Sequence, residues 1–306
     1  MTTVQASGGA TGDGTRPRRP RRPMSKTKLY TRRFMRNKSA VVGLVVFGLI
    51  VAFALTGPFF QRYDHVELDF LALSEGPSAD HWFGTNSGGN DLFAQVVFGL
   101  QRSLMIALAV SSGATVLAAL VGASAAYFGG NVEKALVGFI HFLMATPTFL
   151  IVAMMSEDSG GDWRVISLVL IFMTWFFLAR TIWTLSLSLR EREFITASRY
   201  MGVPGVMIVL RHMVPNIASL LIVNWTLGVI QAVQMETALS FLGFGVKLPD
   251  VSLGSLIRVG ADTITSSPWL FYFPAAVLTL LTVSLALISD GLRDAFDPTS
   301  GAGGHA

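Results

Sequence analysis

The sequence predicts an all-α membrane protein with six transmembrane helices. Of its 306 residues, 52% are hydrophobic and 14% are charged, whereas soluble domains carry about 25% charged residues. Six apolar stretches of 20 to 25 residues occur along the chain, and about 20 helical residues cross a hydrocarbon core of about 30 Å. The chain contains no cysteine, which excludes disulfides, zinc thiolates and thiol catalysis.

The predicted spans follow one another through most of the chain. The second span is dense in Gly and Ser, which helix contacts in lipid favour because small residues let backbones approach. The long segment between the first two spans is too polar to cross a bilayer. In chain order, the predicted spans are 40–60, 104–128, 135–155, 165–187, 217–239 and 269–288.

The two ends of the chain differ in composition from this membrane domain, which we place at residues 28–298. Residues 1–27 consist largely of Gly, Thr, Pro and Arg, a composition that predicts a disordered basic tail. Its run 16–23 holds five arginines and should stay in the cytoplasm near anionic lipid. Residues 299–306 are expected to form a short flexible tail.

Basic residues set the expected orientation in the membrane. With the N-terminus inside, 17 of the 23 Lys and Arg residues lie in inner segments and five lie in outer ones. Arg180 lies within a span. The bias predicts that both termini, and the segment 190–216, face the cytoplasm.

A twin-arginine export signal is an alternative interpretation of the N-terminal region. Arg32 and Arg33 precede an apolar run, and Ala52-Phe-Ala54 resembles a cleavage site. The run has 21 residues rather than the usual 7 to 15, and five further spans follow it. A retained first span is therefore favoured.

The segment 190–216 is the longest charged, amphipathic stretch between two spans. Phe194, Ala197 and Met201 recur at helical spacing, which predicts a helix over 191–202. Gly202 and the proline two residues later should end this helix. A short amphipathic helix held at a membrane is suited to docking in another protein's groove; the alternative is an ordinary loop helix.

This segment resembles the cytoplasmic loop of ABC-importer permeases. The signature of that loop is Glu-Ala-Ala, three residues, Gly, nine residues, then Ile-x-Leu-Pro. The matching positions here are Thr196-Ala197-Ser198, Gly202 and His212-x-Val214-Pro215. The spacing is intact, but Thr196 replaces the Glu and Ser198 replaces the second Ala.

Other stretches carry the same resemblance in the family's order. Residues 189–194 and 211–216 resemble the dipeptide/oligopeptide/nickel branch of these permeases, as do 236–245 and 290–298. The outer stretches 81–91 and 99–103 match in part, because Trp82 stands where Pro is usual and Asn90 where Arg is usual. Together the matches cover about residues 28–298 and favour the C-type permease.

The resemblance implies the type I ABC-importer permease fold, in the inner membrane of a bacterial cell. The expected function is to form half of a translocation pathway for short peptides, although nickel, glutathione, haem or a glycan could replace them. Expected partners are a second homologous permease, one or two ATPase subunits with ATP and Mg²⁺, and an extracytoplasmic solute-binding protein. The residues expected to couple to the ATPase are Glu193, Phe194, Ala197, Ser198, Arg199, Met201 and Gly202.

The chain itself lacks the marks of an enzyme. No Gly-x-x-x-x-Gly-Lys-[Ser/Thr] sequence occurs, so another subunit would have to bind ATP. The five histidines show no His-x-x-x-His spacing, and no nucleophile–base set can be assembled. We therefore expect no catalytic residues, no metal site and no cofactor in this chain.

Polar residues within the spans suggest two further features. Asn224, Gln231 and Gln234 on the fifth span must face protein or water; they line the solute path or join the two permeases. Arg180 on the fourth span is expected to pair with Asp290 near the inner end of the sixth, or to extend toward the interface.

Two other function classes compete with the importer interpretation. A stand-alone secondary transporter or channel would need charged residues at the midplane, where these spans offer only Arg180 and His141. A membrane-embedded enzyme would need a catalytic constellation. Co-purification distinguishes them, because only the importer interpretation requires ATPase partners.

Overall fold

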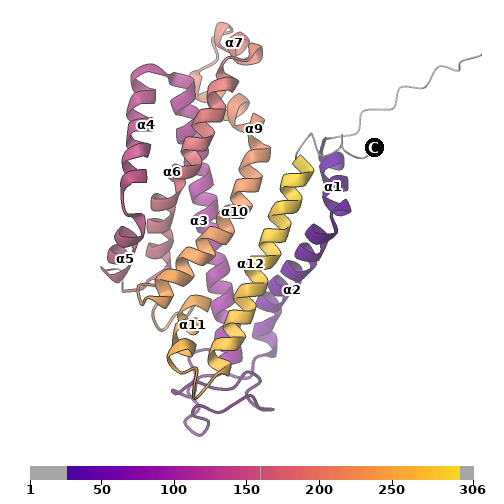
Figure 1. The fold of residues 1–306 in the computed structure, drawn as a ribbon, viewed down its shortest axis with the longest axis vertical. Coiled ribbons are helices and arrows are strands. Elements are labelled where there is room, and N and C mark those ends of the chain that lie inside the picture. Colours follow the sequence, from indigo (N-terminus) through magenta and orange to yellow (C-terminus); the bar gives the residue numbers. More distant parts are fainter. Residues whose placement is uncertain (1–25, 159, 297–306) are drawn as a thin grey trace, which may run out of the picture.

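The described part of the chain is an elongated bundle of helices (Figure 1). The computed structural model describes residues 26–158 and 160–296. The predicted tails lie outside these residues, except that Lys26 and its neighbour already begin helix α1, Lys26–Arg36. Within the described ranges the chain forms helices and loops, with one isolated β-bridge between Thr85 and Asp91.

The fold class predicted from the sequence is confirmed. Five helices are long and apolar enough to cross a membrane, and a sixth span results if one bent pair is counted as a single crossing. The five are α2 (Lys38–Phe60), α3 (Leu92–Phe128), α6 (Trp163–Arg190), α10 (Ala218–Phe241) and α12 (Trp269–Phe296).

The third predicted span is broken rather than continuous. Helix α4 (Gly130–Ala145) and helix α5 (Thr148–Asp158) meet at an angle of 79°. Between them Thr146 has extended backbone angles, φ −83° and ψ 138°. Pro147 is the cause, because proline disfavours the helical conformation of the residue before it.

Helix α3 begins 12 residues earlier than the predicted second span. It has 37 residues, or about 55 Å at 1.5 Å per residue, so it extends beyond a hydrocarbon core. Asp91 caps it by accepting a hydrogen bond from the backbone N–H of Ala94 at 2.8 Å. Gln101, in the part of α3 that precedes the predicted span, donates to the carbonyl of Ala54 on α2 at 2.6 Å.

Helix α3 is the centre of the bundle. It packs against α6, α10 and α2, while α12 packs along α2. Helix α1 was not predicted and lies against the end of α12, where the rings of Tyr30 and Phe296 are 4.8 Å apart. Nearby, Asn37 donates to the carboxylate of Asp294 at 2.9 Å.

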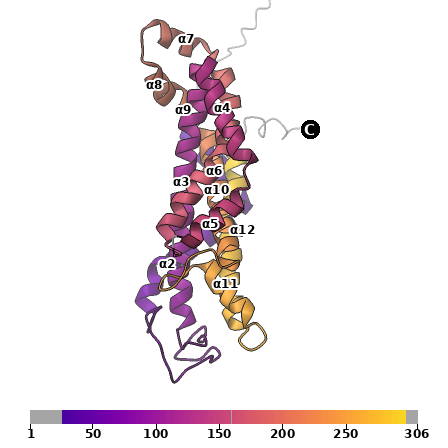
Figure 2. The same ribbon diagram turned by 90° about the vertical axis from the view of Figure 1, so that its left-hand side faces the viewer.

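The segment 190–216 forms a chain of short helices at one end of the bundle (Figure 2). Helix α7 spans Glu193–Tyr200, shorter than the predicted 191–202. Three short pieces then lead back to α10: α8 (Gly205–Ile208), the π-helix η1 (Val209–Met213) and α9 (Val214–Asn216).

The predicted stop of helix α7 at Gly202 is seen in the structure. Gly202 has φ +78°, the left-handed conformation that glycine adopts easily. Its N–H donates to the carbonyl of Arg199 at 3.1 Å, and the N–H of Val203 donates to that of Ser198 at 3.2 Å. These two bonds form a Schellman motif, which satisfies carbonyls that the helix end leaves unpaired.

The opposite end of the bundle carries the loop 61–91 and helix α11, Leu253–Asp262 (Figure 1). Helix α11 was not predicted. Ser252 and Ser255 form a capping box at its start, which explains why ten residues make a stable helix there.

Candidate functional sites

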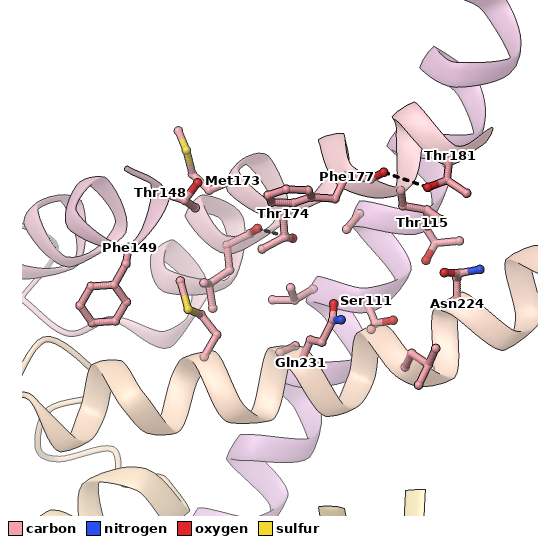
Figure 3. Close-up of a pocket in the computed structure, with 18 residues that line it drawn as sticks. Ser111, Thr115, Thr148, Phe149, Met173, Thr174, Phe177, Thr181, Asn224 and Gln231 are labelled. Atoms are coloured by element: carbon pink, nitrogen blue, oxygen red, sulfur yellow. Dashed lines mark hydrogen bonds between the residues drawn. The ribbon is translucent and has the colours of Figure 1, made fainter. Parts of the chain in front are cut away.

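A pocket of about 490 Å³ opens between α3, α5, α6 and α10 (Figure 3). Most of its wall is apolar, but seven polar side chains face it from all four helices. These are Ser111 and Thr115 on α3, Thr148 on α5, Thr174 and Thr181 on α6, and Asn224 and Gln231 on α10.

Two of the three predicted path residues line this pocket. Asn224 and Gln231 are seven residues apart and lie on the same side of α10. The amide of Asn224 donates to the carbonyl of Leu220 at 2.9 Å, whereas Gln231 makes no hydrogen bond within the described ranges. Gln234 is exposed and does not line the pocket; it lies only about 60° around α10 from Gln231, just outside the wall that faces the pocket.

We did not predict from the sequence that hydroxyl groups would line the pocket. Thr174 and Thr181 each donate to the carbonyl four residues earlier, at 2.7 and 3.3 Å. Their oxygens keep lone pairs that can accept from a solute. Their seven-residue spacing places both threonines on one face of α6, which was the only sequence signal for a role in the pocket. Because threonine is common in membrane spans, this spacing alone did not identify them.

Close packing of α10 on α3 fixes one wall of the pocket. A Cβ atom at Gly228 would come within 2.7 Å of the Ser111 hydroxyl. That hydroxyl donates to the carbonyl of Trp225 at 2.6 Å, and the Trp225 indole donates to Ser112 at 3.0 Å. The pocket offers neutral donors and acceptors, which suit an uncharged polar backbone passing through.

Helix α7 presents an exposed apolar face at the end of the bundle. Phe194 is 40% exposed, Met201 is 74% exposed and Tyr200, which we did not predict, is 87% exposed. Ala197 is also exposed. Large apolar side chains on a short helix outside the spans indicate a docking surface.

The other face of α7 anchors it to the spans. Ile195 is fully buried in an apolar cluster with Tyr127 of α3 and Ile182 of α6. Ser198 is buried as well and donates to the carbonyl of Phe194 at 2.8 Å. We predicted Ser198 in the coupling set, but its side chain lies on this anchoring face.

The two charged residues predicted to couple to the ATPase lie at the edge of α7. Glu193 and Arg199 are exposed, and the guanidinium of Arg199 lies 5.1 Å from the centre of the Tyr127 ring. At the end of α6, Arg190 donates to the carbonyl of Ala126 on α3 at 3.0 Å. Both arginines therefore hold the start of the segment 190–216 against α3.

The predicted ion pair between Arg180 and Asp290 does not form. Both residues are exposed, and neither makes an ion pair within residues 26–158 and 160–296. The reason is the packing order, because α10 and α3 lie between α6 and the C-terminal half of α12 (Figure 1). The same described ranges contain no group of three His, Cys, Asp or Glu residues able to hold a metal ion.

Comparison with known proteins decides the family. Residues 114–300 match the family of binding-protein-dependent transport system inner membrane components. Residues 25–77 match the N-terminal transmembrane domain of oligopeptide transport permease C. The chain is a permease of this family. The ABC-importer resemblance and the type I permease fold are thereby confirmed.

Several curated relatives cover nearly the whole permease. The oligopeptide transport system permease protein OppC of Mycobacterium tuberculosis H37Rv is 43% identical over 90% of this chain and 96% of the relative. A putative peptide permease protein of Brucella suis is 34% identical over 90% and 91%. OppC of Haemophilus influenzae is 34% identical over 87% and 86%.

Family membership settles the broad function. The permease is a multi-pass membrane component of an ABC importer, and it is not an enzyme. ATPase and solute-binding subunits are implied as its partners, and a stand-alone transporter is not favoured.

Proposed function

We propose that the permease forms half of a translocation pathway for short peptides and couples that pathway to ATP hydrolysis through α7. The main support for a peptide pathway is the pocket of about 490 Å³, which has neutral polar groups on four helices. Peptide bonds need donors and acceptors wherever they leave water. The oligopeptide and peptide permeases named above support short peptides as the solute.

The proposed complex contains four kinds of subunit. A second homologous permease closes the pathway, one or two ATPase subunits bind ATP and Mg²⁺, and an extracytoplasmic protein delivers the solute. The exposed face formed by Phe194, Ala197, Tyr200 and Met201 enters a groove of the ATPase. ATP is assigned to the ATPase subunits because this chain has no phosphate-binding loop motif.

Movement of α7 would reach the pocket through its buried face. Ile195 packs against residues of α3 and α6, and both helices continue into the pocket wall. When ATP closes the ATPase subunits, α7 moves with them and tilts these helices. Coupling requires that α7 bind one ATPase state more tightly than the other.

Uptake by pocket variants tests the path. In vesicles holding the complete complex, Gln231→Leu should lower the initial rate of tripeptide uptake about tenfold, because a peptide bond loses a partner in an apolar wall. Gln234→Leu is the matched control on the same helix and should transport like the parent. Equal uptake rates for the two variants would show that Gln231 does not contact the peptide during transport.

We also propose that both termini and α7 lie in the cytoplasm of a bacterial cell with this permease in its inner membrane. The chain has no cysteine, so single cysteines can report the orientation. Ala79→Cys in the loop 61–91 should react with a membrane-impermeant maleimide in cells whose inner membrane is intact. Asn131→Cys at the start of α4 should react only after lysis. Both positions are exposed; reaction of Asn131→Cys without lysis would reverse the topology.

A further inference from the structure

A second pocket lies at the end of the bundle opposite α7. Its volume is about 530 Å³, within the range of about 300–1,000 Å³ that small-molecule sites occupy. It opens between the loop 83–91, the loop 243–251 and helix α11. Its apolar wall consists of Val246, Leu248, Val251, Leu256 and Val259, and its polar wall contains Asn86, Asn90, Gln95 and Arg258.

Arg258 carries the uncompensated charge of this pocket. Lys247 at its edge pairs with Glu157 at 3.0 Å, and Asp250 pairs with Arg102 at 2.5 Å. Arg258 forms no ion pair or hydrogen bond with any residue in the described ranges. Asp262, one helical turn further along α11, is exposed and does not reach it.

The other polar side chains of the wall are already engaged. Asn86 donates to the side-chain oxygen of Asn90 at 3.1 Å, and Asn90 donates to the carbonyl of Glu67 at 3.1 Å. Gln95 donates to the carbonyl of His65 at 3.4 Å. The guanidinium of Arg258, with five N–H donors, is therefore the principal free donor facing the pocket.

The backbone around Arg258 is shaped to receive it. Gly243 has φ +93°, and a Cβ atom there would collide with the guanidinium. Because Gly243 has no side chain, the guanidinium can approach this loop closely. Arg258 is exposed, so its fork of donors is open to a ligand, and such a fork favours a planar, two-oxygen anion.

Helix α11, which carries Arg258, is fixed to the spans at its start. The N–H of Leu253 donates to the hydroxyl of Ser103 on α3 at 3.1 Å. Gly254 lies so close to α10 that a Cβ atom would come within 2.7 Å of the Cα of Thr237. The backbone that carries Arg258 is thus held in place before a ligand arrives, which limits the backbone entropy lost on binding.

We propose that this outer pocket binds the C-terminal carboxylate of a short peptide through Arg258. The identity of the ligand rests on the proposed function. A pathway for peptides of varied sequence can rely only on groups that all of them share, namely the backbone and the two termini. Among these, the C-terminal carboxylate is the planar anion that a free guanidinium recognises. The apolar wall would contact the side chain of the peptide's C-terminal residue without selecting a particular amino acid.

A fluorophore in the pocket can test this site directly. Leu248 lines the pocket and is 79% exposed, so Leu248→Cys in this cysteine-free chain can carry an environment-sensitive dye. The complete complex, with cysteine-free partners, is titrated in nanodiscs with tri-alanine and with tri-alanine amide. We expect the free acid to bind about tenfold more tightly than the amide, because only the acid forms a charge-assisted pair.

Variants of arginine then identify the group responsible. Arg258→Gln should abolish the preference for the acid, and Arg258→Lys should keep part of it, since lysine retains the charge without the fork. Arg164→Gln, an exposed arginine outside the pocket, should keep it fully. A preference that survives Arg258→Gln, or that is absent from the parent, would overturn the proposal. So would a loss of affinity for the solute-binding protein with the acid preference unchanged.

Uptake measured with the same complex separates the two proposals. If the complex imports tripeptides but Arg258→Gln leaves the preference for acid over amide intact, the carboxylate site is wrong and the proposed function stands. If the complex imports no peptide at all, the proposed function is wrong, whatever the dye reports.

Discussion

Replacing Phe194 with aspartate should abolish solute uptake while leaving the permease folded and inserted. Phe194 is 40% exposed, so the substitution removes little buried area within the chain. It lies in the first turn of α7, where a negative charge interacts favourably with the helix dipole. In an ATPase groove the same carboxylate would be desolvated without a partner, at a cost of several kcal/mol. We expect ATPase binding to weaken on the order of 100-fold.

Two controls isolate the effect of the Phe194 substitution. Phe194→Leu keeps an apolar side chain and should retain most uptake. Glu193→Ala removes an exposed charge at the edge of α7 and should cost under about 1 kcal/mol. The measurements are co-purification of the ATPase, uptake, and ATP hydrolysis in vesicles. A complex of Phe194→Asp that assembles and transports like the parent would show that α7 is an ordinary loop helix.

The spans could be predicted from the sequence because long apolar runs have few alternatives to a membrane helix. The prediction failed where a local interaction decides the outcome. Pro147 breaks the third span through its effect on the preceding residue, and hydropathy contains no such information. Helix α3 extends past the apolar run because Asp91 caps it and the polar Gln101 finds a partner on another helix.

Tertiary packing explains most of what the site prediction missed. The sequence placed Gln234 with Asn224 and Gln231 on one polar stripe, but only the latter two reach the pocket. The order of helices around the bundle keeps Arg180 away from Asp290, and one-dimensional spacing cannot give that order. Ser198 belongs to a motif that resembles a docking signature, yet its side chain anchors α7 to the spans.

The stretches 99–103 and 236–245 had no role in the sequence analysis beyond their resemblance to the family. In the structure, the stretches 99–103 and 236–245 both contact the start of α11. Ser103 bonds the backbone of Leu253 at 3.1 Å, and Ser240, which bonds Glu236 at 2.6 Å, lies 3.3 Å from the hydroxyl of Ser252. These stretches are therefore explained by their common task of positioning α11, which a single sequence cannot show.

Replacing Gly202 with valine should uncouple ATP hydrolysis from uptake. No atom lies within 4 Å of a Cβ built at Gly202, so the substitution causes no collision, and its effect comes from the backbone alone. At φ +78° a residue with a side chain is strained by about 1–2 kcal/mol, and a β-branched one is strained most. The loop should relax by opening the Schellman motif that holds Val203 to Ser198, which changes the angle at which α7 meets α8.

Gly202→Asn is the matched control, because asparagine tolerates the left-handed conformation and its side chain is similar in volume to that of valine. In vesicles of the complete complex, Gly202→Val should keep its permease partner and hydrolyse ATP at a rate that solute and binding protein no longer stimulate. Uptake should fall severalfold. Gly202→Asn should behave nearly like the parent. If valine and asparagine reduce uptake equally, side-chain volume at the ATPase surface governs coupling; if neither does, the left-handed turn plays no part in it.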